Sequence, residues 1–200
     1  MAGAMLFVAG ATAQTPNDFG LRTNQTPGLA VALLPGESVG HEQVIRELIR
    51  SGTNEFMFVV PEGLRTQAPS EDMIVLTSRD MSCYLSIRSA GPAPATPGLK
   101  EALRERIASE YPQVSNLEEF TTTVADREGT GLQLRQELPG VGTRLIRMIW
   151  VPFKAGVLEF TLNVDANRAS TGQGAFDMML LTFRSNERGK IEVVIRSDKT

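Results

Sequence analysis

The residues of this chain that are best able to do chemistry are few and isolated. His41 is the only histidine and Cys83 is the only cysteine. Metal sites built from several histidines and disulfides within the chain are therefore excluded, and a histidine-based triad would depend on His41 alone. The sequence contains no G-x-S-x-G, H-E-x-x-H, Walker or Cys-x-x-Cys motif. We therefore expect no catalytic residues, no metal site, no cofactor and no enzymatic activity.

Two short motifs have a chemical reading and a structural one. Glu118 and Glu119 are adjacent on an expected strand, so they point to opposite faces and cannot act as an acid/base pair. Thr171-Gly172-Gln173-Gly174 precedes an expected helix and could offer N–H groups to an anion, but it lacks the lysine of a nucleotide-binding loop. We interpret this glycine-containing segment as a helix entry.

Cys83 shares a strand face with Leu85 and Ile87, which predicts that Cys83 is a core residue.

Trp150 is the sole tryptophan and shares one face of an expected strand with Met148 and Ile146. If that face is covered, the three side chains belong to the core. If Trp150 is exposed, the three form a candidate binding surface, because tryptophan is common at binding sites.

Composition limits the classes of partner. The 200 residues carry a net charge of -3, with 42% hydrophobic and 22% charged residues. These values are ordinary for one folded domain and give no polyanion-binding signature, so we expect no nucleic-acid partner.

The first residues, MAGAMLFVAGATAQ, resemble a secretory signal with Ala11-Thr12-Ala13 as its cleavage site. A basic n-region is missing, so the start is either truncated or a marginal signal. We expect a signal peptide over residues 1–13, a flexible lead-in over 14–27 and a single domain over 28–200. The expected location is periplasmic or secreted, and no apolar stretch is long enough to span a membrane.

The expected elements are organised around a long hairpin over Gly140 to Val164 that turns at Lys154-Ala155-Gly156. Its first strand is apolar on both sides, which predicts that both faces are covered. Its second strand alternates, which predicts one buried face and one wet face carrying Glu159, Thr161 and Asn163.

Apolar spacing predicts a helix over Leu99 to Tyr111, with Thr96 as its cap and Pro97 in its first turn. The outer face of this helix carries charges of both signs, Arg106 among them, and we interpret it as a solvated face. A second helix is predicted over Gly174 to Phe183, with Ser170 or Thr171 as an alternative start. We also expect a helix over Glu42 to Arg50, although that segment could pair as a strand. Alternation or apolar runs predict further strands over Leu29–Leu34, Phe56–Val60, Met73–Thr77, Ser82–Arg88, Leu117–Ala125, Leu132–Leu138 and Lys190–Arg196.

The chain contains the strand and turn FMFVVPEGL (Phe56 to Leu64), and its last predicted helix ends in LLTFRS (Leu180 to Ser185). Between them come two short strands, a helix and a meander of four strands. With the meander between them, they resemble the PsbP-like superfamily, and DcrB-type bacterial periplasmic proteins most closely. Leu64 stands where that family usually has an aromatic residue. The resemblance implies an α+β fold, an α/β/α sandwich around a central antiparallel sheet, whose members serve as binding or assembly factors without common catalytic residues.

Three functions follow as hypotheses. The first is an exported, non-catalytic accessory or protein-binding module of the cell envelope, with an unidentified protein partner. The second is a carrier of a small apolar ligand, which predicts a cavity between the sheet and Leu99 to Tyr111, lined by Ile146, Met148 and Trp150. The third is a hydrolase, which predicts a polar cleft containing a perturbed carboxylate or His41.

Overall fold

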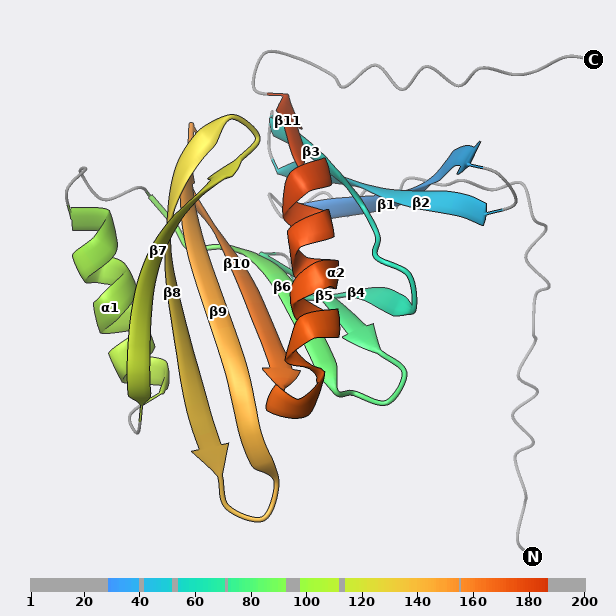
Figure 1. The fold of residues 1–200 in the computed structure, drawn as a ribbon. Coiled ribbons are helices and arrows are strands. Elements are labelled where there is room, and N and C mark those ends of the chain that lie inside the picture. The colour runs from blue at the N-terminus through green and yellow to red at the C-terminus, as the bar shows by residue number, and fades with distance from the viewer. Residues whose placement is uncertain are drawn as a thin grey trace, which may run out of the picture.

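The β9–β10 hairpin lies in the middle of a seven-stranded antiparallel sheet (Figure 1). The computed structural model describes residues 29–39, 42–51, 54–70, 72–92, 98–111, 114–154 and 156–186. In spatial order the sheet contains β4 (Leu64–Ser70), β5 (Met73–Ser78), β6 (Cys83–Ser89), β10 (Gly156–Asp165), β9 (Gly142–Phe153), β8 (Arg127–Leu138) and β7 (Ser115–Val124). β4 was not predicted from the sequence.

The hairpin reverses where it was expected, but Gly156 already pairs with Phe153. The glycine therefore belongs to β10 and not to the loop, while Ala155 lies outside the described residues. Gly156 has φ +131°, and a Cβ there would lie 2.3 Å from the carbonyl oxygen of Gly91. Glycine is needed because this backbone approaches so closely: the N–H of Val157 donates to that same carbonyl at 2.9 Å.

A second, four-stranded antiparallel sheet has the order β1 (Leu29–Val39), β2 (Glu42–Ser51), β3 (Asn54–Val59) and β11 (Arg184–Asn186). The predicted helix over Glu42 to Arg50 is wrong, because β2 pairs along most of its length with β1 and β3. Pairing on both edges outweighs the helical spacing of its apolar residues. The predicted strand Lys190–Arg196 lies outside the described residues.

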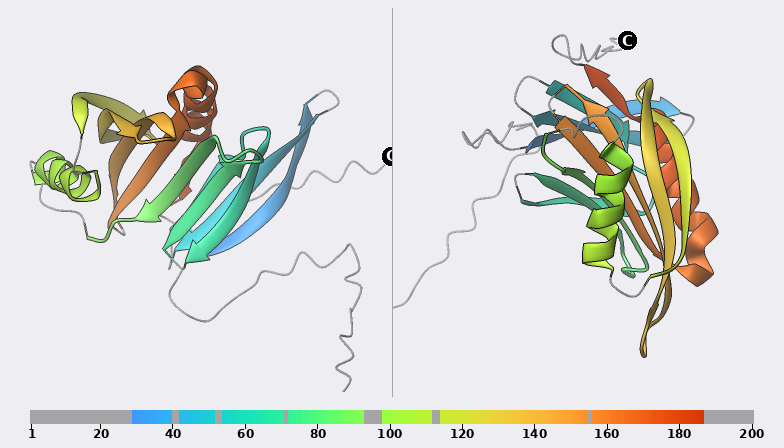
Figure 2. Two further views of the ribbon diagram at one scale, coloured as in Figure 1. Left: turned by 90° about the horizontal axis from the view of Figure 1, so that it is seen from below. Right: turned by 90° about the vertical axis from the view of Figure 1, so that its left-hand side faces the viewer.

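Two helices lie on opposite faces of the seven-stranded sheet (Figure 2). α1 (Gly98–Glu110) buries Leu99, Leu103 and Ile107, while α2 (Ala169–Thr182) follows the short 3-10 helix η1 (Ala166–Arg168). The predicted helices over Leu99 to Tyr111 and Gly174 to Phe183 are confirmed, and α2 begins at Ala169, next to the alternative start at Ser170 or Thr171. Thr96 and Pro97 are outside the described ranges. The predicted α+β class, with helices on both faces of an antiparallel sheet, is confirmed.

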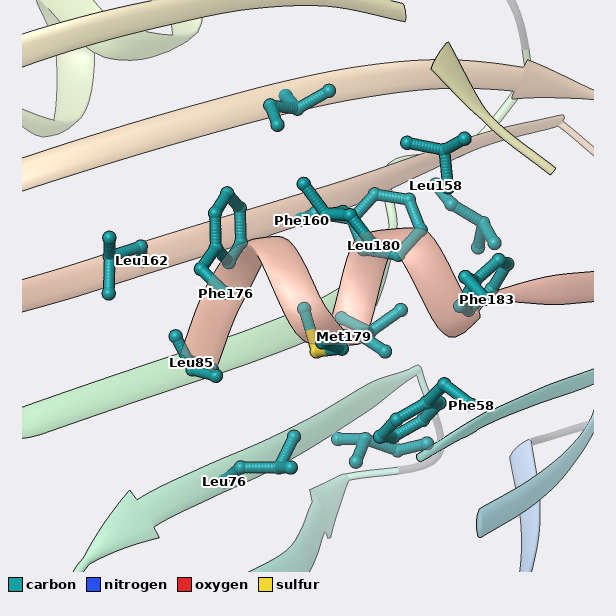
Figure 3. Close-up of a cluster of buried hydrophobic side chains, with 14 of the residues drawn as sticks. Phe58, Leu76, Leu85, Leu158, Phe160, Leu162, Phe176, Met179, Leu180 and Phe183 are labelled. Carbon is teal, nitrogen blue, oxygen red and sulfur yellow. The ribbon is translucent and has the colours of Figure 1, made fainter. Parts of the chain in front are cut away.

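The larger core lies between α2 and the two sheets (Figure 3). Phe183, directly after α2, is fully buried and has its ring centroid 5.0 Å from that of Phe160 on β10 and 5.6 Å from that of Phe56 on β3. One aromatic side chain therefore joins the second helix to both sheets. The backbone N–H of Val59 also donates to the hydroxyl of Thr182 at 3.1 Å, which ties β3 to α2.

Alternate residues of β9 contact different layers. Leu145, Ile149 and Val151 belong to the core under α2, whereas Ile146 and Met148 belong to the core under α1. This confirms that the strand is covered on both faces. The predicted wet face of β10 is wrong for Glu159 and Thr161, which are 3% and 6% exposed, while Asn163 is half-buried. Glu159 is covered by the side chains of Arg88 and Trp150 and by Arg106 of α1.

Candidate functional site: a charged pocket beside helix α1

A pocket of about 280 Å³ opens beside α1, on the α1 face of the seven-stranded sheet. We call it the α1 pocket, and it is lined by Asp72, Arg88, Ser89, Ala90, Arg106, Trp150 and Glu159. A second depression surrounds the β8–β9 turn, but Glu137 is its sole charged lining residue. The α1 pocket is the stronger candidate because it gathers charges of both signs.

The register of three neighbouring strands brings the floor of the α1 pocket together. Glu159 on β10 stands directly opposite Arg88 on β6 and directly opposite Trp150 on β9. Directly opposed residues of an antiparallel pair lie on the same face. The three side chains therefore form one row across the sheet, next to α1.

Glu159 is the centre of this row. Its Oε1 accepts a hydrogen bond from Nη2 of Arg88 at 2.6 Å, and its Oε2 accepts one from Nε1 of Trp150 at 2.9 Å. A buried carboxylate needs such charge-assisted and neutral donors to offset the loss of water. Because both oxygens are occupied by fixed donors, we interpret Glu159 as an anchor of the pocket floor and not as a general base.

Arg106 brings a second guanidinium from α1. Its Nη2 lies 2.7 Å from Oε2 of Glu110, one helical turn away, and its Nε lies 3.8 Å from Oε2 of Glu159. That Nε is buried and has no hydrogen-bond partner in the part of the chain that the structure describes. The Arg106 side chain is 32% exposed, so the cation reaches both the buried carboxylate and the mouth of the pocket.

Asp72, in the turn between β4 and β5, supplies a second carboxylate to the pocket lining. It is exposed, and its Oδ1 accepts a hydrogen bond from the Ser70 hydroxyl at 2.6 Å. The α1 pocket therefore presents Asp72 as an anionic group and Arg106 as a cationic group above a floor in which Glu159 and Arg88 are paired. Such an arrangement can hold a polar or charged group, because the Asp72 carboxylate can accept hydrogen bonds and the Arg106 guanidinium can donate them.

The electrostatics next to the pocket keep one phenol neutral. Burial raises the pKa of Tyr111 to about 12, and the neighbouring carboxylates of Glu110 and Glu159 act in the same direction. Tyr111 therefore stays protonated to a higher pH than an ordinary tyrosine, and its hydroxyl can donate a hydrogen bond at this end of α1.

The structure separates the three residues of the candidate binding surface. Ile146 and Met148 are 0% and 1% exposed beneath α1, so they are core residues and cannot form part of an exposed surface. Trp150 is 8% exposed, and it lines the α1 pocket while its indole N–H is bound to Glu159. Of the three, Trp150 alone is among the residues that line the α1 pocket.

The other chemically notable residues have structural surroundings. Cys83 is buried in the core under α2, and burial raises the pKa of its thiol. Thr171 to Gly174 lie inside α2 and not before it, which corrects the expected helix entry. A Cβ at Gly172 would lie 2.7 Å from Cγ2 of Val164, so that glycine permits close helix packing.

The two adjacent glutamates of β7 have different partners. Lys100 and Arg104 pair with Glu119, while Glu118 accepts a hydrogen bond from Gln133. His41 lies outside the described residues.

Sequence reasoning missed Glu159, Arg88, Arg106 and Asp72 as a group. Glu159 was expected on a wet face and Arg106 on the solvated side of its helix. The error came from the length assigned to the hairpin loop, which sets the register of β9 and β10. Because Gly156 pairs with Phe153, Glu159 lies opposite Trp150. With the three-residue loop that was expected, Glu159 would have been displaced from Trp150 by one position.

Within the described ranges no helix is long and apolar enough to cross a membrane. No group of three or more His, Cys, Asp or Glu side chains in the same part of the chain could hold a metal ion.

Comparisons with known proteins give structural likeness alone. No family model matches the chain, and no curated protein matches it. The solution structure of cyanobacterial PsbP (CyanoP) from Synechocystis sp. PCC 6803 is similar, with 14% identity and a TM-score of 0.49, over 76% of this chain and 98% of that one. The crystal structure of LpqN, described as involved in cell envelope biogenesis of Mycobacterium tuberculosis, has 13% identity and a TM-score of 0.46, over 78% of this chain and 91% of that one.

The first of these structures bears the name of the family that the sequence resembles. At this identity and TM-score the likeness says nothing about what this chain binds. The closer relation to DcrB-type proteins stays a prediction.

Proposed function

We propose that this protein is an exported, non-catalytic accessory module of the cell envelope that binds a protein partner through the α1 pocket. The observation that carries the proposal is the row Arg88, Glu159 and Trp150, which the sheet holds in fixed positions beside the cation of Arg106. The partner would place one charged or polar side chain in the pocket.

The size and chemistry of the pocket support a protein partner over a free apolar molecule. About 280 Å³ is slightly below the roughly 300–1,000 Å³ of typical small-molecule sites, which are mostly apolar. The α1 pocket instead has four charged lining residues, and arginine and tryptophan are enriched where proteins meet.

The core beneath α1 gives no support to the apolar-carrier hypothesis. The side chains that would line such a cavity, Ile146 and Met148, are buried in one cluster with Leu103 and Ile107 of the helix. The hydrolase hypothesis has a polar pocket in its favour, but both oxygens of Glu159 accept hydrogen bonds from Arg88 and Trp150. We therefore keep the binding module as the proposal.

The proposed location rests on the sequence. The apolar segment of MAGAMLFVAGATAQ and its small-x-small site favour export to the periplasm or beyond. We accordingly propose residues 1–13 as a signal peptide, 14–27 as a lead-in and 28–200 as one domain of PsbP-like, DcrB-type character.

Site-specific crosslinking in the native host tests this function. A photoreactive amino acid replaces Ser89, which lines the α1 pocket, or Ser109, which is exposed on α1 and is not among the lining residues. We expect position 89 to give a discrete adduct with one envelope protein, identified by mass spectrometry, and position 109 to give little of it. Equal adducts from both positions, or none from position 89, would contradict the proposed use of the pocket.

A further inference from the structure

Glu47 is a fully buried carboxyl group in the interior of the four-stranded sheet. It is 0% exposed. On β2 it stands opposite Phe58 of β3 and opposite Leu33 of β1. A glutamate at such a position is expensive, because an ionised carboxylate loses its hydration without a compensating charge.

The hydrogen bonds of Glu47 cross the boundary between the two sheets. Its Oε2 accepts from the hydroxyl of Thr66 at 2.9 Å, and Thr66 belongs to β4, the edge strand of the seven-stranded sheet. Its Oε1 is buried and has no hydrogen-bond partner among the residues described above. One oxygen thus links the two sheets by a hydrogen bond, and the other has no partner among these residues.

On β2, β3 and β4 the described side chains that share the face of Glu47 are uncharged. Arg46 on β2 and Arg65 on β4 occupy alternate positions and point to the other sides of their strands. The neighbours on the Glu47 side, by register and strand alternation, are Ile45 and Ile49 on β2, Phe56 and Phe58 on β3, Leu64 and Thr66 on β4, and the positions of Val31, Leu33 and Pro35 on β1. Among the residues of β2, β3 and β4 whose side chains the structure describes, no titratable group on this side therefore compensates a charge on Glu47.

We propose that Glu47 is a proton-binding site that couples the docking of the four-stranded sheet against β4 to pH. With the proton bound, the carboxyl is neutral, its burial costs far less and it can both accept and donate hydrogen bonds. With the proton released, a charge without a counter-ion lies between the sheets and the docked arrangement is destabilised.

The direction of the effect follows from the pKa. Burial raises the pKa of Glu47 from 4.5 to about 7, and the hydrogen bond from Thr66 opposes that rise. When the sheets separate, the carboxyl meets water and regains its ordinary pKa. The docked form is therefore fully favoured below about pH 4.5, and its advantage is lost as the pH rises through about 7. This inference is independent of the proposed function, because the α1 pocket plays no part in it.

Carbon-13 NMR titration of the full chain tests the proposal, with Glu47→Gln identifying the resonance. We expect the Glu47 carboxyl to titrate near pH 7. We expect Thr66→Val to raise that midpoint further, because it removes the hydrogen bond that stabilises the charged form. A midpoint at or below about 5 in the wild type would overturn the proposal.

Hydrogen exchange, corrected for intrinsic rates, measures the coupling to docking. We expect the opening equilibrium of β2 and β3 amides to increase by roughly 50- to 100-fold between about pH 5 and about pH 8 in the wild type. Glu47→Gln should abolish most of that increase, while Glu62→Gln, which changes an exposed glutamate, should leave it intact. Identical pH profiles for the wild type and Glu47→Gln would overturn the coupling.

Discussion

The two faces of the seven-stranded sheet differ in chemistry although the same strands supply both. The α2 face is mostly apolar: the rings of Phe56, Phe58, Phe153 and Phe160 lie around that of Phe183. Its one charged β9 residue, Arg147, lies over the rings of Phe120 and Phe176 and pairs with Asp177 of α2. The α1 face combines a small apolar core with a row of charged side chains that continues into a pocket. One face therefore joins helix and sheets, and the other keeps polar groups near solvent in fixed positions.

This contrast shows how a β-strand can serve two purposes through its two-residue period. On β10, Phe160 and Leu162 point into the core under α2, while Glu159 and Thr161 lie on the α1 side. The packing of the residues on the α2 side fixes the register of the strand. That register determines where the residues on the α1 side lie. The pocket is therefore expected to keep its geometry as long as the α2 face stays packed.

The largest effect is expected from Phe183→Ala on the α2 face. Phe183 is fully buried and contacts rings from both sheets, so its removal should lower the free energy of unfolding by roughly 3–5 kcal/mol. Denaturant unfolding measures this loss. Leu181→Ala is the matched control, because Leu181 is 74% exposed and its truncation should cost about 0.5 kcal/mol or less. Equal losses for the two variants would remove the distinction between packed and exposed positions on this face.

A smaller effect is expected from Glu159→Ala on the α1 face. The change leaves the buried indole N–H of Trp150 and the guanidinium of Arg88 without their acceptor. Because Arg88 is 26% exposed and can regain water, we expect a loss of roughly 2 kcal/mol in unfolding free energy.

Trp150→Phe offers the companion measurement, since it removes one donor and leaves the charged pair. We expect it to cost roughly 1 kcal/mol, less than Glu159→Ala. A larger loss for Trp150→Phe would mean that packing of the indole, and not the carboxylate, holds the pocket floor.

The sequence predicted the elements whose pattern is local. The helix over Leu99 to Tyr111 and the hairpin over Gly140 to Val164 both follow from apolar spacing that packing reinforces. β2 was misassigned because VIRELI fits either period, and the choice was made by pairing with β1 and β3, which spacing within the segment does not reveal.

The candidate site was not predictable in the same way. Arg88, Trp150 and Glu159 come from three strands, and their meeting depends on register to within one residue. Arg106 arrives from a helix whose charged side chains all suited a solvated face. Trp150 was identified because tryptophan is distinctive by type, whereas a single glutamate in an apolar strand gives no sign of its partners.

The most direct test of the account compares partner capture by two matched double variants. Asp72→Asn with Arg106→Met alters the α1 pocket, and Asp177→Asn with Arg184→Met alters exposed charged residues on or next to α2. With the photoreactive residue at position 89 in each, the account predicts that the first variant stays folded and loses most of the adduct. The second should keep it, and a full adduct from the first variant would contradict a binding role for the α1 face.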